Sequence, residues 1–231
     1  MQSAGQAPPN KGRKFPGEPL TDGEMRMILR ACSQRAPTGI RNRALLTVMY
    51  RAGLRVSEAL ALRPADVDPA AGTVRVLAGK GRKARTVGID DGALAVLQRW
   101  TDKRRELGLR GRALFCTLQG GPLRDTYVRD MLNRAGARAG IVKRVHPHGL
   151  RHSYASALAR EGVPLNVISK ALGHSSSAIT SRYLDHIAPA DVIALGRSRT
   201  WPVEEPHDAV AAADDRASWK ATIRTTSSGS S

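Results

Sequence analysis

Two short runs of alternating hydrophobicity constrain this fold most, because they interrupt a chain that otherwise has the periodicity of helices. In Thr73–Leu77 valines alternate with polar residues, and Arg85–Ile89 is a second β-like run. A period of two is typical of strands that bury one face. The segment GKGRK at 79–83 lies between the runs and combines two glycines with three basic residues. The sequence therefore predicts a β-hairpin with a strongly basic turn.

Elsewhere the apolar residues recur with helical spacing. Aromatic residues make up only 4% of the chain, so its core must consist mainly of Leu, Val, Ile and Ala, which suit helices. Thr21 and Glu24 form a potential capping box at the start of the ordered region. Further helices are expected over Ile40–Ala52, ended by Gly53, over Arg55–Leu62, around Leu97, around Met131, and in pieces from Leu150 to about Leu195 with breaks at Gly162 and Gly173. Ala113–Leu118 is a candidate third strand. The predicted fold class is mainly α with a small antiparallel β-sheet (α+β).

Composition also divides the chain along its length. Residues 1–19 are rich in Pro, Gly and Lys, and predict a flexible basic N-terminal arm. Residues 20–196 form the expected folded domain. Residues 197–231 end in TTSSGSS and predict a disordered C-terminal tail.

The charge of the chain favours a polyanionic partner. There are 37 Lys and Arg against 20 Asp and Glu, a formal net charge of +17. No apolar stretch approaches the ~20 residues of a membrane span, which disfavours a membrane partner and leaves nucleic acid in the lead. The first residues contain no apolar core typical of a secretory signal, so Cys32 and Cys116 are expected to be reduced and the protein cytoplasmic.

Some of the basic and titratable residues have ordinary explanations when taken singly. Arg55 and Glu58 lie three residues apart and could form a common surface ion pair. Lys80 could be a solvated loop charge. His148 and His152 have the i, i+4 spacing of a zinc site, but no glutamate lies between them and Arg151 would repel the cation, so no metal is expected. Tyr183 alone could be a packing residue.

Four separated segments change that interpretation when they are taken together. They are GLRVSEAL at 53–60, GKGRKAR at 79–85, HPHGLRHSYASAL at 146–158 and LGHSSSAITSRYLDH at 172–186. In this order they resemble the catalytic domain of the tyrosine recombinases, the phage integrase family, over roughly residues 18–196. The resemblance implies a tyrosine-recombinase catalytic-domain fold and a site-specific DNA recombinase.

The resemblance also implies a role for each residue of the site. Tyr183 would be the nucleophile that forms a 3′-phosphotyrosyl bond, and Lys80 the general acid that protonates the leaving 5′ oxygen. Arg55 and Arg151 would clamp the phosphate, and Glu58 would orient the basic groups. His148 would transfer protons and contact the phosphate, and His174 would add positive charge beside it. The expected DNA-contacting residues are Arg82, Lys83, Arg85, Lys143 and Arg144.

In that reaction the covalent bond conserves the phosphodiester energy, so neither ATP nor a metal or other cofactor is expected. The arginines would supply the positive charge that magnesium supplies in other phosphoryl transfers. The implied partners are double-stranded DNA and further copies of the chain, as a homotetramer on DNA and a monomer in solution. Most family members carry an N-terminal DNA-clamp domain, which has no counterpart in residues 1–19, so weaker and salt-dependent site binding is expected.

Three alternatives compete with this hypothesis. PLNVISKALGHSSSAITSRYL at 164–184 has the pattern of a helix-turn-helix, which would suit a DNA-binding regulator. A catalytically limited accessory recombinase relative would share the same motifs. A type IB topoisomerase would use similar chemistry to relax supercoils.

Overall fold

The computed structural model describes residues 18–77 and 84–173. The chain divides into two units, Met1–Ala188 and Pro189–Ser231, and every described residue belongs to the first. The elements are α1 (Asp22–Arg30), α2 (Pro37–Arg51), α3 (Val56–Ala61), the short 3-10 turn η1 (Pro64–Asp66), β1 (Val67–Asp68), β2 (Thr73–Val76), β3 (Arg85–Gly88), α4 (Asp91–Glu106), α5 (Asp125–Arg138), α6 (Pro147–Arg160) and α7 (Leu165–Leu172). Lys80, Arg82, Lys83, His174 and Tyr183 lie outside the described residues.

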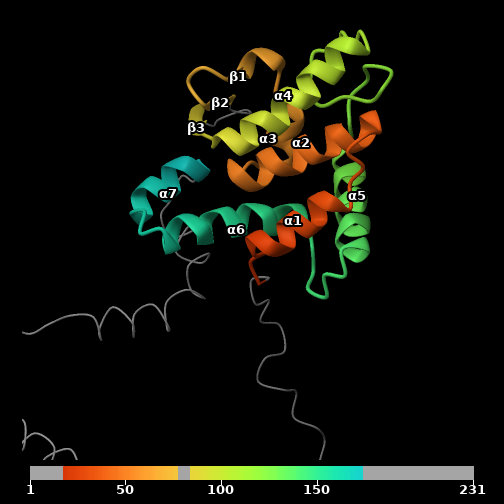
Figure 1. The fold of residues 1–231 in the computed structure, drawn as a ribbon. Coiled ribbons are helices and arrows are strands. Elements are labelled where there is room, and N and C mark those ends of the chain that lie inside the picture. Colours follow the sequence, from red (N-terminus) through yellow and green to blue (C-terminus); the bar gives the residue numbers. More distant parts are fainter. Residues whose placement is uncertain (1–17, 78–83, 174–231) are drawn as a thin grey trace, which may run out of the picture. The chain divides into compact units, whose positions relative to one another are not determined.

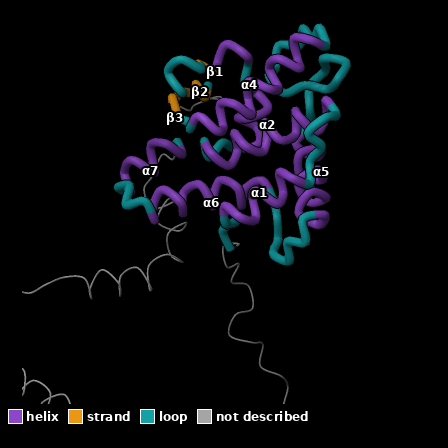
Figure 2. The backbone as a smooth tube through the Cα atoms, viewed as in Figure 1, coloured by secondary structure: helices purple, strands orange, loops and turns teal. Residues whose placement is uncertain are grey.

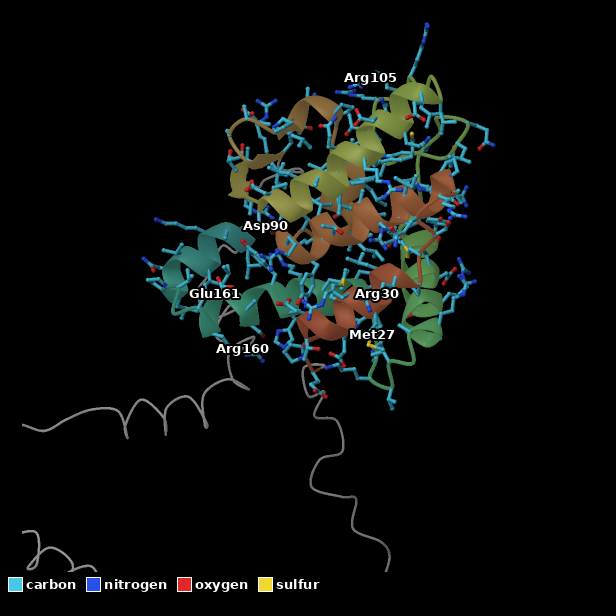
Figure 3. The ribbon with its side chains drawn as sticks, viewed as in Figure 1. Met27, Arg30, Asp90, Arg105, Arg160 and Glu161 are labelled. Carbon is cyan, nitrogen blue, oxygen red and sulfur yellow. The ribbon has the colours of Figure 1, made fainter. Side chains whose placement is uncertain are left out.

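Helix α2 is the central element of the described domain. It packs against α4 on one side and α6 on the other, while α5 lies at one end and the small sheet and α7 at the other (Figure 1). Leu45, Leu46, Val48 and Met49 are fully buried, which places the core around this helix. Asp90, labelled in Figure 3, fixes the start of α4, because its side chain accepts a hydrogen bond from the Ala93 amide at 3.1 Å and pairs with Arg51 of α2 at 2.7 Å.

The two predicted strands and their pairing are confirmed by the structure, and the basic turn between them lies outside the described residues. Strands β2 and β3 pair antiparallel with Val74 opposite Val87, and both side chains face the core. The sheet has the order β1-β2-β3 and occupies one small corner of the molecule (Figure 2). The predicted fold class, α-helical with a small antiparallel sheet, is also confirmed.

The predicted third strand at Ala113–Leu118 is wrong. The third strand is β1, and Cys116 forms only an isolated bridge with Pro122. Leu114, Phe115 and Cys116 are all fully buried, so three consecutive side chains pack in the core and the one-in, one-out alternation of a half-buried strand is absent there. Its backbone is held by residues distant in the sequence, since the Leu114 amide donates to the Leu62 carbonyl and the Trp100 indole donates to the Leu114 carbonyl.

The helix ends agree with the predicted capping signals more closely than with the predicted boundaries. The capping box of Thr21 and Glu24 is present at α1, and Gly53 follows α2 with a left-handed φ of 60°. Helix α2 begins at Pro37, three residues before the predicted Ile40, because proline suits the first turn of a helix. The stretch expected to start at Leu150 begins at Pro147, for the same reason. In the described ranges, no helix combines the length and apolar character that crossing a bilayer requires.

Candidate active site

The site is built first on the sharp corner between α2 and α3. Gly53 makes this corner possible, because a Cβ there would lie 2.2 Å from the Tyr154 ring of α6, and its φ is positive. Arg55 is the N-cap residue of α3, and Glu58 lies one turn later. The Glu58 carboxylate accepts bonds from the Arg55 amide at 2.9 Å and from its guanidinium at 2.8 Å. The predicted pair is therefore a capping arrangement that fixes the direction of Arg55.

Two further arginines meet the same carboxylate from distant parts of the chain. Arg85 of β3 donates to both Glu58 oxygens, at 3.1 and 2.9 Å, and Arg151 of α6 lies 3.7 Å from it. Burial alone would raise the pKa of Glu58, but hydrogen bonds from Arg85 and Arg55 outweigh it and lower the pKa to about 2. One carboxylate is thus ionised at any physiological pH and shared by three guanidinium groups.

Arg151 is 1% exposed and joins three elements. It donates to the Gly53 carbonyl at 2.7 Å and to the carbonyl of Leu172, the last residue of α7. These bonds tie α6 to the α2–α3 corner and to the end of α7. A planar fork can serve such divergent acceptors, whereas a lysine cannot.

A cavity of about 440 Å³ opens beside these arginines. Its lining includes four arginines and two histidines and contains no carboxylate, and the residues are Arg55, Val56, Ser57, Arg129, Asn133, Arg144, His146, Pro147, His148 and Arg151. A concave surface of this charge favours an anion. Among residues 18–77 and 84–173, no group of three or more His, Cys, Asp or Glu residues is placed to hold a metal ion.

The histidines of the HPHGLRH segment have different positions. His148 reaches the surface at the cavity, where desolvation and the charges of Arg151, His146 and Arg55 lower its pKa below the ordinary value of 6.5. The lowered pKa favours the neutral form of His148. His152 is 3% exposed inside α6, in agreement with a structural role.

Two predicted DNA-contacting residues are engaged inside the protein. Arg85 is occupied by Glu58 and by the Ala171 carbonyl. Lys143 pairs with Glu24 at 2.8 Å and with Glu18 at 3.2 Å, and its side chain is only 15% exposed. Their charges are paired with carboxylates within the fold, and a contact of either residue with DNA stays a prediction. Arg144, by contrast, is exposed and lines the cavity.

Several residues that line the cavity were not predicted as site residues, among them Arg129, Asn133 and His146. Arg129 and Asn133 lie four residues apart on the exposed face of α5, and His146 precedes α6. The i, i+4 spacing of two polar side chains was visible in the sequence, but nothing in it indicated that α5 lies against the start of α6.

Comparison with known proteins decides the family. The model of the phage integrase family matches residues 18–188. The chain belongs to the phage integrase family. The fold and the family predicted from the four segments are thereby confirmed.

The sequence relatives and the similar solved structures of this integrase-family chain are also recombinases. It is 40% identical over 171 residues to the tyrosine recombinase XerC of Halalkalibacterium halodurans, covering 71% of this chain and 56% of the relative. It is 37% identical over 196 residues to XerC of Xanthomonas axonopodis pv. citri, covering 83% and 62%. The chain thus spans less than two thirds of the length of these relatives.

Among solved structures, XerA recombinase superposes with a TM-score of 0.72 at 29% identity, covering 82% of this chain and 68% of that one. A post-cleavage complex of the XerH site-specific recombinase with a palindromic difH substrate gives 0.68 at 27% identity, covering 80% and 54%.

Proposed function

We propose that this chain is a site-specific DNA recombinase that cleaves and rejoins DNA through a 3′-phosphotyrosyl bond to Tyr183. One observation carries the proposal: Arg55, Arg151 and His148 converge on a cavity whose lining holds no carboxylate. The curated relatives are tyrosine recombinases, and the XerH structure is a complex with a DNA substrate, which supports the same activity here.

In this proposal the scissile phosphate lies in the cavity. Arg55 and Arg151 contact its non-bridging oxygens and stabilise the charge that develops on the pentacoordinate phosphorus. Glu58 takes up part of the charge of both arginines and fixes the plane of the Arg55 fork. Preorganised cations of this kind lower the barrier because they need no rearrangement during the reaction.

The proton transfers follow from the ordinary acidities of the groups. A phenol has a pKa near 10, so Tyr183 needs positive surroundings and a base. Neutral His148 can accept the phenol proton. The Tyr183 oxygen then bonds to phosphorus, the bond to the 5′ oxygen breaks, and Lys80 gives that oxygen its proton. His174 joins Arg55 and Arg151 as a phosphate contact. A 5′-hydroxyl from another strand reverses these steps and rejoins the DNA without ATP.

Double-stranded DNA is the proposed partner. Arg129, Asn133 and Arg144 are exposed and line the cavity, so they are proposed to contact the duplex next to the phosphate. A homotetramer on DNA and a cytoplasmic location stay predictions.

A nicked suicide substrate tests the proposal, because loss of a short 5′-hydroxyl fragment traps the covalent protein–DNA adduct. The wild-type chain should form the adduct on its cognate site, and Tyr183→Phe should bind the same DNA and form none. Tyr154→Phe is the matched control, because it also removes one tyrosine hydroxyl. The ring of Tyr154, which packs on Gly53, is kept, so this variant should still form the adduct. Mass spectrometry of the adduct should place the bond on the peptide that contains Tyr183.

Other outcomes would replace the proposal. Binding to the cognate site with no adduct would favour a DNA-binding regulator or an accessory relative. Relaxation of arbitrary supercoiled plasmid would indicate a type IB topoisomerase.

A further inference from the structure

Arg85 makes contacts that the phosphate chemistry alone does not require. It lies on β3, and its side chain is 13% exposed. The Nε atom donates to the Ala171 carbonyl at 2.7 Å, while the two terminal nitrogens bind the Glu58 carboxylate at 3.1 and 2.9 Å. All three guanidinium nitrogens of Arg85 therefore donate hydrogen bonds. The acceptors are distant in the sequence, since Ala171 lies 86 residues and Glu58 27 residues away.

The end of α7 is held by two arginines at once. Helix termini leave carbonyls without intrahelical partners, and here Ala171 is bonded by Arg85 and Leu172 by Arg151. Both arginines also face Glu58. Through these two arginines, the last turn of α7 is linked to Glu58, the same carboxylate that orients Arg55.

Gly173 shows how close this contact is. It ends α7 in the left-handed conformation, with φ 62° and ψ 45°. A Cβ at this position would lie 2.9 Å from a terminal nitrogen of Arg85 and 3.2 Å from its Cδ. The backbone therefore leaves the helix directly against the Arg85 side chain, and the next residue in the sequence is His174.

We propose that Arg85 is a positioning residue of the active site, an inference that rests on the proposed function. By holding the last turn of α7 next to Glu58, it fixes the position of the helix end that His174 and Tyr183 follow in the sequence. The same residue lies just after segment 78–83, which contains Lys80. One guanidinium therefore links the strand that follows the general acid to the helix that precedes the nucleophile.

A DNA-contacting role for Arg85 makes opposite predictions. A cation that neutralises a DNA phosphate contributes to affinity, and its loss reduces the salt dependence of binding by about one unit of slope. A positioning residue whose charge is matched by Glu58 should leave both affinity and slope unchanged, and should alter the rate of covalent bond formation instead.

The first experiment tests the anchor without any activity. Hydrogen exchange of the free protein is compared for wild type, Arg85→Gln and Arg75→Gln. Arg75 is the matched control, because it pairs with Asp66 from the neighbouring strand β2. We expect peptides covering the end of α7 to exchange about tenfold faster or more in Arg85→Gln only, as when a hydrogen bond to a charged group is lost. Unchanged exchange there would overturn the anchor, whether or not the protein is a recombinase.

The second experiment measures adduct formation on the suicide substrate under saturating DNA. We expect Arg85→Gln to slow the adduct by about tenfold or more, with unchanged DNA affinity and salt slope, while Arg75→Gln matches wild type. Millimolar guanidinium should partly restore Arg85→Ala, relative to NaCl at the same ionic strength, because it refills the cleft between Glu58 and Ala171. A wild-type rate in Arg85→Gln, or a loss confined to affinity, refutes positioning. Absence of any wild-type adduct refutes the proposed function and leaves the exchange result to decide the anchor.

Gly173→Asn provides an independent variant in case Arg85 substitutions unfold the protein. Asparagine tolerates the left-handed conformation, so the helix end is kept while the new side chain displaces the Arg85 guanidinium. The same slow adduct at unchanged DNA affinity is expected, and a wild-type rate would count against the proposal.

Discussion

Two buried arginines, Arg41 of α2 and Arg151 of α6, have similar burial but different surroundings, and only Arg151 is proposed to contact the phosphate. They are 3% and 1% exposed. Arg41 donates to the Cys116 carbonyl at 2.9 Å and the Tyr127 hydroxyl at 2.5 Å, with its guanidinium 5.1 Å from the centre of the Tyr127 ring. Arg151 also bonds backbone carbonyls, but it does so beside Arg55, His148 and the cavity of about 440 Å³.

Burial and hydrogen bonding are therefore common to both residues and do not mark the active site. The difference lies in the surroundings. Among the described residues no carboxylate forms an ion pair with Arg41, whose charge is dispersed over neutral acceptors and a ring. Around Arg151 several cations share a single carboxylate, Glu58, which leaves the cavity positive overall. A site for phosphate needs that excess of positive charge.

The largest effect is expected for Arg151→Lys. One ammonium cannot reach both the Gly53 and Leu172 carbonyls and still face the cavity, so adduct formation should fall by about 10²–10³-fold, as for loss of one preorganised donor to a transition state. Single-turnover cleavage at saturating DNA measures this. Arg41→Lys is the matched control and should cleave at the wild-type rate per folded molecule. Equal losses in both variants would mean that Arg41 and Arg151 do not differ in function.

Glu58→Gln should have the next largest effect, and it should depend on pH. The pKa of Glu58 is lowered from 4.5 to about 2, so the carboxylate stabilises the fold above pH 4.5 and this stability is lost as the pH falls toward 2. We expect the variant to lose about 1.5–3 kcal/mol of unfolding free energy at pH 7 and to show a smaller decline on acidification. Urea unfolding at several pH values tests both. Parallel curves for variant and wild type would mean that Glu58 is not the shared counter-ion.

Arg41→Met should reduce stability and leave chemistry alone. The aliphatic volume is kept, but the buried Cys116 carbonyl loses its donor, at a cost of about 1–3 kcal/mol. Urea unfolding gives the loss, and adduct formation per folded molecule should equal that of wild type. A slow adduct from a fully folded variant would assign Arg41 to the functional class.

The smallest effect is expected for Lys143→Met. Its ion pairs with Glu18 and Glu24 are partly exposed, so their loss should cost no more than about 1 kcal/mol. Titration of duplex DNA at several salt concentrations should give an unchanged slope. A slope reduced by about one would restore Lys143 as a phosphate contact, as the sequence first suggested.

Local signals in the sequence predicted much of the fold. The Thr21–Glu24 capping box, the turn at Gly53 and the hairpin of β2 and β3 depend on residues close together in the chain, and the structure confirms each. The strand predicted at Ala113–Leu118 was wrong because a short apolar run has the same pattern in a strand and in an irregular buried segment. Only packing between helices tells them apart, here the bond from Trp100 to Leu114.

For the candidate site, too, some features could be predicted from the sequence and others depended on the tertiary structure. The sequence by itself determined the family, through motifs whose order and residue types are readable without a fold, and with it the candidate roles of Arg55, Arg151 and His148. Only the tertiary structure decided which charged side chains form ion pairs within the protein. Arg85 and Lys143 sit in basic stretches, yet each is matched by a carboxylate brought in from elsewhere in the chain. Charge is a property of a residue, whereas its neutralisation depends on distance, and distances between remote residues are set by packing.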